Sequence, residues 1–558
     1  MRHLFKKHSI ILFLLTLIAA FSHFYNLTWG APFYFHPDER NIASAVSQLQ
    51  FLHHMNPHFF AYGSLPIYVT YFTGYATNYL FSFLNPKPYP LNPSFEQAIL
   101  LGRIYSALFA TLLIPLLFVL GKKLKNETTG LLAAFFATTC VGFIQFAHFG
   151  TFEMWLTFFG TLLFWSCLSV MKEKSLEHIV LLSIIFGVLI SVKISSLALL
   201  PIPILAMLFQ QKLTNPYSGR TAFWRKELRN ISLLLGKCLF FVSITTLIFI
   251  LTNPYVLLDT KDFLSSVQYE SSVALGTEPV FYTGNFLNTT PVVYQFLHVY
   301  PFLLNFLMTI LFIPSFIYIL FAIFKYKNKQ FALLAAFFLF LFAPQAYLFV
   351  KWTRYMMPTL PFIMLTVAIT LSSLLQTTKP LARILAVEIT ILIVMNTIVA
   401  FSYFKTAFID IDSRILAVLF AQRAIPLNAQ ILTEPSDLGR LPFEEAFPHI
   451  DTFNFYELDN NSPDATEMLL QQKIASDHYI ILPSQRILQS RLGNPAKFPK
   501  GYVFYKTLLS GGLGFHKIYQ TPCDIFCRIT YLGDPVYWWE QTASVFDRPT
   551  VFIFKKDS

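Results

Sequence analysis

Charged residues are scarce in this chain of 558 amino acids. They make up 13% of it, roughly half of the share of about 25% that is usual in soluble proteins. Hydrophobic residues make up 55% and aromatic residues 17%. A soluble protein needs a charged surface that this composition cannot supply. The composition therefore excludes a cytosolic enzyme, a disordered chain and a nucleic-acid-binding protein, in spite of a net charge of +11. It predicts an α-helical polytopic membrane protein.

Cysteine is also rare, with five residues in the chain. Cys140, Cys167 and Cys238 lie in apolar runs, where a thiol behaves as a small hydrophobic group. Cys523 and Cys527 share one short polar loop without a His or a third Cys at ligand spacing, which argues against a zinc site. Two alternatives remain for this pair: free thiols, or a local disulfide if the loop lies outside the cytosol.

Long apolar runs fill the first 404 residues. Arg2, Lys6 and Lys7 precede the first run, which continues to about residue 29 without a cleavage site of small residues, so we expect an uncleaved first span. Further runs of a length that crosses a bilayer bring the expected number of spans to about eleven. They lie near residues 98–120, 128–146, 152–171, 178–194, 195–210, 231–252, 299–324, 330–349, 355–375 and 382–404.

The distribution of basic residues predicts the orientation. Residues 405–558 hold 15 of the 41 Lys and Arg residues, which leaves 26 in the part before them. With eleven spans, 18 of these 26 fall at the N-terminus and in the even-numbered loops, on one face of the membrane. The positive-inside rule makes this face cytoplasmic. We therefore expect a multi-pass protein of the cell (inner) membrane with a cytoplasmic N-terminus. The 18 residues are Arg2, Lys6, Lys7, Lys122, Lys123, Lys125, Lys172, Lys174, Lys212, Arg220, Arg225, Lys226, Arg229, Lys325, Lys327, Lys329, Lys379 and Arg383.

One apolar stretch, residues 59–84, is long enough to span but would invert every later basic loop if it did. We expect it to lie along the membrane or to re-enter from outside, because Gly63, Pro66 and Gly74 fit a broken or interfacial helix. The membrane domain then comprises residues 1–404, with outer loops at 30–97 and 253–298. The second of these loops is either a cover over a substrate or a plain surface excursion.

Residues 405–558 have the pattern of a small extracytoplasmic α/β domain. A helix is expected at 412–424 and strands at the segments AQILT, HYIIL, YVFYK, HKIYQ and VFIFK, which Pro, Gly and Asn separate. The segment Phe546–Pro549 favours a turn over a contact to an acceptor.

Ionisable side chains gather in the outer loops, although such groups are costly at membrane depth. Asp38 and Glu39 follow His36 and Pro37 in the first loop, and Glu153 ends a short loop that contains His148. Taken singly, these acids are typical of the first turn of a helix, where they complement its dipole.

Cations lie at the same expected depth: Arg103, Lys193, Lys351 and Arg354, the last beside Tyr355. Each alone fits an interfacial anchor. Together with the acids, they suit a reaction in which cations hold a lipid-borne phosphate and a carboxylate accepts a proton.

These residues, in this order, resemble the C-superfamily of glycosyltransferases (GT-C), and in particular glycosyltransferase family 39, which contains protein O-mannosyltransferases and aminoarabinose transferases. The resemblance covers most of residues 9–375. It rests on His36-Pro37-Asp38-Glu39, Gly102-Arg103-Ile104-Tyr105-Ser106-Ala107, Gly121-Lys122-Lys123-Leu124, the His148–Glu153 loop, Val192-Lys193-Ile194 and the Lys351–Pro358 segment with Arg354-Tyr355.

The resemblance implies transfer of a sugar from a polyprenyl-phosphate donor to a hydroxyl of a protein, lipid or glycan acceptor at the outer face, by inverting displacement. It makes Asp38 the general base with Glu39 beside it, and it leaves open whether Glu153, where relatives often have Asp, is catalytic. Arg103, Lys193, Lys351 and Arg354 are expected to bind the donor phosphate, and His36, His148 and Tyr355 the substrate. No metal is required if the cations neutralise the phosphate, although paired acids facing a phosphate also suit Mg²⁺ or Mn²⁺.

Two alternatives to an enzyme remain. A transporter or flippase of a lipid-linked anionic sugar usually places its charges near the bilayer midplane and has paired repeats, neither of which is evident here. A scaffold with a partner-binding C-terminal domain is the other alternative.

Overall fold

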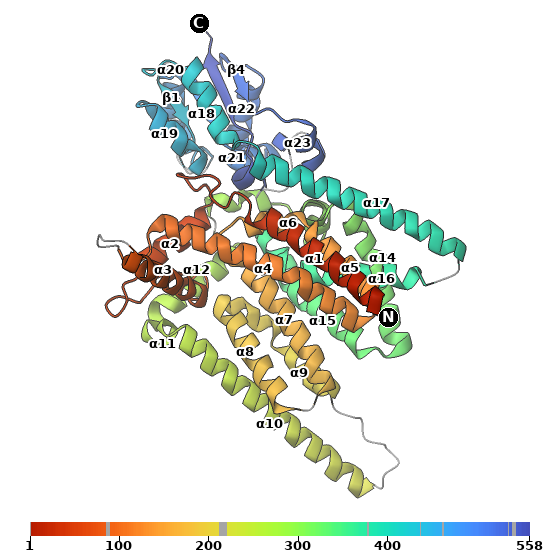
Figure 1. The fold of residues 1–558 in the computed structure, drawn as a ribbon. Coiled ribbons are helices and arrows are strands. Elements are labelled where there is room, and N and C mark those ends of the chain that lie inside the picture. The colour runs from red at the N-terminus through yellow and green to blue at the C-terminus, as the bar shows by residue number, and fades with distance from the viewer. Residues whose placement is uncertain are drawn as a thin grey trace.

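The computed structural model describes residues 2–84, 90–173, 175–210, 220–278, 280–376, 379–435, 437–459, 463–533, 535–537 and 543–557. Two of the basic residues used for the predicted topology, Lys174 and Lys212, lie outside the described residues. A bundle of helices makes up the larger part of the molecule, and a smaller part with a β-sheet lies at one end of it (Figure 1).

The bundle contains long apolar helices and short segments between them. Their bounds are α1 Arg2–Phe24, α2 Pro37–Ser47, α3 Leu65–Leu84, α4 Phe95–Leu124, α5 Glu127–Thr138, α6 Val141–Ala147, α7 Glu153–Lys172, α8 Leu176–Val192, η1 Ile194–Leu199, α9 Pro201–Gln210, α10 Arg220–Thr252, α11 Tyr255–Leu258, α12 Thr260–Leu275, η2 Phe281–Phe286, η3 Gln295–Val299, α13 Tyr300–Leu304, α14 Phe306–Tyr326, α15 Lys329–Ala346, η4 Thr353–Thr359, α16 Leu360–Leu374 and α17 Lys379–Phe404.

Polar residues begin several of these helices. Ser94, Asn126 and Ser175 accept a hydrogen bond from a backbone N–H in the first turn of α4, α5 and α8. Such caps satisfy donors that have no partner within the helix. They also fix the points at which the chain turns back into the bundle.

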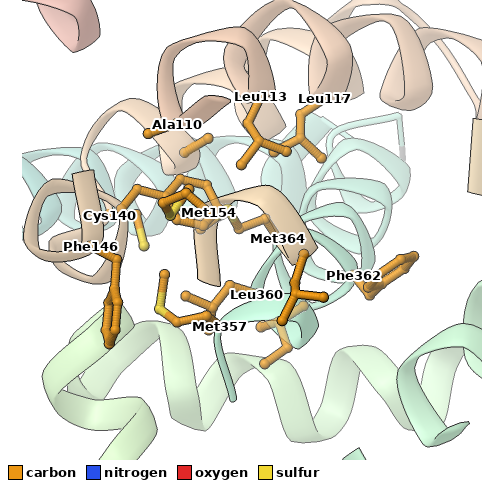
Figure 2. Close-up of a cluster of buried hydrophobic side chains, with 14 of the residues drawn as sticks. Ala110, Leu113, Leu117, Cys140, Phe146, Met154, Met357, Leu360, Phe362 and Met364 are labelled. Atoms are coloured by element: carbon orange, nitrogen blue, oxygen red, sulfur yellow. The ribbon is translucent and has the colours of Figure 1, made fainter. Parts of the chain in front are cut away.

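The centre of the bundle is apolar and closely packed. Side chains of α4, α6, α7, η4 and α16 meet there, among them Leu113, Phe146, Met154, Met357 and Leu360 (Figure 2). All five are at most 2% exposed. Dispersion and exclusion of solvent hold such a core together.

Seven helices in the described part of the chain are long and apolar enough to cross a membrane, and the pair α5 and α6, bent by 53°, makes an eighth. The remaining three predicted spans coincide with shorter apolar helices, at His8–Phe24, Leu176–Val192 and Ile194–Gln210. The predicted class of polytopic helical membrane protein is therefore confirmed, whereas the number of eleven spans is not. Within residues 59–84, α3 continues unbroken through Gly74, so this glycine does not interrupt the helix.

The C-terminal part is an α/β structure, as predicted. Its five strands have the order β2-β1-β3-β5-β4, in which β1 is parallel to β2 and β3, while β5 is antiparallel to β3 and β4. The bounds are η5 Lys405–Ile409, α18 Ser413–Ala424, β1 Ile431–Thr433, η6 Leu438–Arg440, α19 Leu441–Ala446, β2 Ile450–Thr452, α20 Pro463–Ser476, β3 Tyr479–Leu482, α21 Arg486–Gly493, α22 Pro499–Leu509, β4 Phe515–Gln520, α23 Ile525–Thr530, η7 Pro535–Tyr537, η8 Ala543–Asp547 and β5 Phe552–Lys556.

The expected helix at 412–424 and four of the five expected strands are confirmed. The fifth, YVFYK, is wrong, because these residues belong to α22. Gly501, Phe504, Tyr505 and Leu508 are the buried positions of α22, and this spacing of three, four and seven residues is helical.

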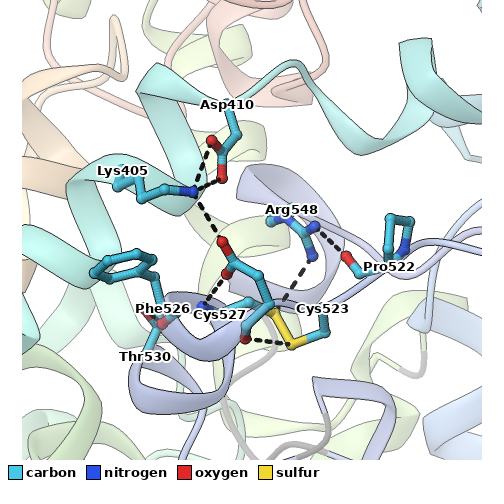
Figure 3. The surroundings of a disulfide bond; sticks show 9 residues. Lys405, Asp410, Pro522, Cys523, Phe526, Cys527, Thr530 and Arg548 are labelled. Carbon is cyan, nitrogen blue, oxygen red and sulfur yellow. Dashed lines mark hydrogen bonds and ion pairs between the residues drawn. A yellow bond between two sulfur atoms is a disulfide. The ribbon is translucent and has the colours of Figure 1, made fainter.

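Cys523 and Cys527 form a disulfide, with Cα atoms 5.3 Å apart. It lies at α23, beside the end of α17 (Figure 3). Nearby, Lys405 is bound to Asp410 and Asp524 at 2.8 and 2.9 Å. Of the two alternatives for this pair, the local disulfide is the one confirmed.

Candidate active site

Asp38 lies in the first turn of α2, where it forms an ion pair with Arg354 of η4. The two side chains are 24% and 27% exposed, so the pair remains accessible. Burial raises the pKa of the Asp38 carboxyl, whereas Arg354, His36 and Lys193 lower it. The lowering effects together are larger, so the pKa lies below its ordinary value of 3.8. Asp38 is thus a carboxylate held by a cation, 316 residues away in sequence.

Glu39, the next residue, has a different environment. Its side chain and that of Arg103 on α4 are fully buried and form a bidentate pair, with both N–O distances 2.8 Å. The remaining terminal nitrogen of Arg103 donates to the carbonyl oxygens of Leu27 and Trp29, at 2.7 and 2.9 Å. A guanidinium with these four hydrogen bonds is not available to a phosphate, so the geometry does not support the predicted phosphate-binding role of Arg103.

Glycines allow α4 to lie close to the loop before α7, beside this pair. A Cβ atom on Gly102 would lie 3.1 Å from the Cα atom of Gly150, so larger residues would separate the two segments. The N–H of Gly150 donates to Glu39. Glu39 and Arg103 therefore fix the start of α2 to the rest of the bundle, next to Asp38.

Lys193 follows α8 and lies between two aromatic rings. Its Nζ is 5.2 Å from the ring centroid of Tyr62 and 5.0 Å from that of Tyr355, distances typical of cation–π contacts. Burial and the neighbouring Arg354 lower the pKa of Lys193, against the opposing effects of the nearby acids. No ion pair of Lys193 is found among the described residues.

A cavity of about 60 Å³ joins several of these side chains. Glu153, Lys193, Arg354 and Tyr355 line it, from α7, the end of α8 and η4. Its other walls are apolar at Leu156, Leu189, Ala198, Leu199, Phe340 and Leu341 and polar at Ser195, Ser196 and Gln345. Two cations beside apolar walls suit the phosphate of an amphipathic lipid.

Glu153 is the residue with the least usual environment. It begins α7, is 2% exposed, and neither carboxylate oxygen has a hydrogen-bond partner within the described ranges. A buried carboxylate without hydrogen bonds is costly. These oxygens are therefore free to accept hydrogen bonds from a ligand.

Two other predicted site residues have structural partners. Lys351 donates to the carbonyl oxygens of Leu348 and Phe349, at 3.2 and 3.1 Å, just after α15. Both ring nitrogens of His148 face carbonyl oxygens, at 2.7 and 2.8 Å. The structure does not bring either residue into the cavity, and the geometry gives no support to their predicted binding roles.

His36 contacts the rings of Phe149 and Phe546, with centroid distances of 4.5 and 4.6 Å. Burial lowers the pKa of this imidazole and so favours its neutral form. It adjoins the Asp38 turn without lining the cavity.

The loop 253–298, which is predicted to lie outside, supplies a group that the sequence did not single out. Glu270 of α12 interacts electrostatically with Lys193, Arg354 and Asp38, and burial raises the pKa of its carboxyl. Tyr62, which contacts Lys193 from the segment before α3, is a second residue near the site that the sequence did not single out. Their signal was weak, because a Glu in a polar helix and a Tyr in an aromatic-rich loop are both common.

A group that could hold a metal ion occurs in the described residues at His58, Asp259 and Asp262, whose ligand atoms lie within 4.8 Å of one another. It is separate from Asp38 and Glu39, each of which has an arginine partner. The alternative of Mg²⁺ or Mn²⁺ at the paired acids of the first loop stays a prediction.

A larger cavity of about 490 Å³ lies between α3 and the start of α4. Among its lining residues, Asn78 and Gln97 bond each other, at 3.0 and 2.8 Å. It contains none of the predicted site residues. We therefore place the candidate active site at the smaller, charged cavity.

Comparisons with known proteins agree with this architecture. Residues 95–223 match the family model of dolichyl-phosphate-mannose-protein mannosyltransferases. No curated protein sequence matches the chain. Among solved structures, it is similar to the oligosaccharyltransferase AglB of Archaeoglobus fulgidus in complex with an inhibitory peptide and a dolichol-phosphate. The identity is 11% and the TM-score 0.54, with 99% of this chain and 89% of that chain covered.

A second structure of the A. fulgidus oligosaccharyltransferase, tethered with an acceptor peptide containing the NVT sequon, has 10% identity and a TM-score of 0.52 and covers 98% of this chain and 88% of that one. ArnT from Cupriavidus metallidurans bound to undecaprenyl phosphate has 11% identity and a TM-score of 0.48, with coverages of 88% and 94%. The predicted resemblance is confirmed: the chain has a GT-C-like fold, that of lipid-carrier-dependent glycosyltransferases of the C-superfamily.

Proposed function

We propose that the protein is a glycosyltransferase that moves a sugar from a polyprenyl-phosphate donor to an acceptor hydroxyl at the outer face of the membrane. One observation supports this most strongly. Arg354, Lys193 and Glu153 line one cavity, and Asp38, from a fourth segment, forms an ion pair with Arg354. The similarity of the fold to an enzyme solved with a dolichol-phosphate agrees with such a donor.

In the proposed reaction, the acceptor oxygen attacks the anomeric carbon while the bond from that carbon to the phosphate oxygen breaks. The proton of the hydroxyl passes to Asp38, and the electron pair leaves with the polyprenyl phosphate. Arg354 and Lys193 stabilise the charge that develops on the phosphate. Attack opposite the leaving group inverts the anomeric configuration. The oxygens of Glu153 accept hydrogen bonds from hydroxyl groups of the sugar.

We further propose that the reaction needs no bound metal ion, because the two cations already neutralise the phosphate. The distribution of basic residues supports an outer location of the site. The disulfide at Cys523 and Cys527 agrees with it, because disulfides persist in oxidising compartments.

Donor binding tests the assignment of the cations. Lys193→Met should weaken the binding of polyprenyl phosphate about 10- to 100-fold, the range expected for one charged hydrogen bond. Lys351→Met is the matched control and should leave affinity unchanged, since its Nζ binds carbonyl oxygens. The measurement is binding of labelled polyprenyl phosphate to the protein in nanodiscs. Equal losses in both variants would contradict the assignment.

The pH profile tests the state of Asp38. A general base acts only when deprotonated, so kcat/KM should fall as pH drops through its pKa. Because the pKa of Asp38 lies below 3.8, the wild-type rate should stay level from pH 7 down to about 4.5. Arg354→Gln removes the main cation and should move the acid limb upward by about one pH unit or more. An unchanged limb in Arg354→Gln would contradict control of Asp38 by Arg354.

A further inference from the structure

A segment of the C-terminal part enters the helical bundle next to the candidate active site. It comprises Phe546, Asp547 and Arg548, at the end of η8, and it is not a surface turn, since Asp547 is 2% and Arg548 6% exposed. The carboxylate of Asp547 accepts hydrogen bonds from Gln145 Nε2 of α6 at 2.6 Å and from the Tyr403 hydroxyl of α17 at 2.7 Å. We call Phe546–Arg548 the wedge.

Two arginines connect the wedge to the C-terminal part: Arg548, the last residue of the wedge, and Arg414 of α18. Arg548 donates to the carbonyl oxygen of Pro522 at 2.6 Å and contacts the sulfur of Cys527 at 3.5 Å, so the disulfide loop supports it (Figure 3). Arg414 of α18 donates to the carbonyl oxygens of Phe546 and Asp547, at 2.9 and 3.3 Å. The wedge is therefore held by hydrogen bonds both to the helical bundle and to the C-terminal part.

Phe546 of the wedge and Arg414 contact the two residues that precede α2. The ring of Phe546 lies 4.6 Å from that of His36, which also contacts the ring of Phe149. The guanidinium of Arg414 lies 3.7 Å from the ring centroid of Phe35, which is 1% exposed. Phe35 and His36 directly precede the turn that carries Asp38.

We infer that Phe546 is a positioning residue, which fixes His36 and through it the carboxylate of Asp38, so that the C-terminal part completes the active site. This inference rests on the proposed function. A scaffold role for the C-terminal part, separable from transfer, is inconsistent with it. Phe546 itself contacts neither of the cavity cations among its described ring contacts.

The test compares variants of the full-length chain in nanodiscs. Phe546→Leu removes the ring from His36 but keeps an apolar side chain, so kcat should fall about 10- to 100-fold, the effect of a small displacement of a catalytic group. The dissociation constant of polyprenyl phosphate should change less than about twofold, because the cations remain in place. Phe546→Tyr keeps the ring and should retain most of the wild-type kcat.

Phe504→Leu is the matched control. Phe504 is 5% exposed and packs on Phe455, inside the C-terminal part and away from His36. It should lose thermal stability without losing kcat per folded molecule. Wild-type kcat in Phe546→Leu, or an equal loss in Phe504→Leu, would overturn the inference while leaving the proposed function intact. A wild-type protein that transfers no sugar from any polyprenyl-phosphate donor would overturn both.

Discussion

Asp38→Asn should reduce sugar transfer by about 10² to 10⁴-fold, the usual contribution of a general base. The substitution keeps the size of the side chain and removes its ability to accept a proton from the acceptor hydroxyl. Because Asp38 and Arg354 are partly exposed, loss of this ion pair should cost at most about 1 kcal/mol of stability. Transfer of a labelled sugar, measured beside the thermal unfolding temperature, separates the two effects.

Asp451→Asn provides the control for this variant. Asp451 of β2 also forms an ion pair, with Lys473 at 3.2 Å, and is 47% exposed. It should transfer sugar at the wild-type rate. Transfer by Asp38→Asn within about threefold of wild type, well below the range for a general base, would remove Asp38 from the mechanism.

Arg103→Met should destabilise the protein by about 3–5 kcal/mol, because it leaves the buried carboxylate of Glu39 without its partner. Both side chains are fully buried, so water cannot replace the lost hydrogen bonds. The double variant Glu39→Gln/Arg103→Met removes the uncompensated charge and should recover part of the loss. Denaturant or thermal unfolding in detergent measures each free-energy difference.

Lys122→Met is the matched comparison, since Lys122 pairs with Glu127 at the surface, at 2.7 Å with 44% of the Lys122 side chain exposed. Its effect should stay below about 1 kcal/mol. Wild-type stability in Arg103→Met together with a loss of donor binding would return Arg103 to the phosphate site.

The sequence predicts the class of fold well, because the scarcity of charge and the length of the apolar runs can both be read without knowing any long-range contact. The C-terminal error has a physical cause. Tyr502–Lys506 combines aromatic and β-branched residues, which favour strands, but burial at Gly501, Phe504, Tyr505 and Leu508 follows a helical period.

For the site, sequence order identifies the acids and cations but not their partners. Asp38 and Glu39 are neighbours with opposite environments, one accessible beside Arg354 and one buried with Arg103. Likewise, Lys351 and Arg354 are three residues apart, and only Arg354 lines the cavity. Whether a cation is free for a ligand depends on which backbone carbonyls and side chains the fold brings next to it from distant segments. These contacts cannot be predicted from a single sequence.

The same limit explains the missed contribution of the C-terminal part. Phe546 lies 510 positions after His36 in the chain, and the segment around it has the composition of a turn. Only the folded structure places its ring on His36. Long-range contacts of this kind leave no periodic signal.

A structure of the wild-type protein with polyprenyl phosphate, determined in nanodiscs by cryo-electron microscopy, tests the central claim most directly. We expect the phosphate within hydrogen-bonding distance of both Lys193 and Arg354, with the polyprenyl chain leaving along the apolar wall near Leu189 and Phe340. A phosphate bound elsewhere, with the cavity at Glu153 and Lys193 filled only by water, would contradict the account.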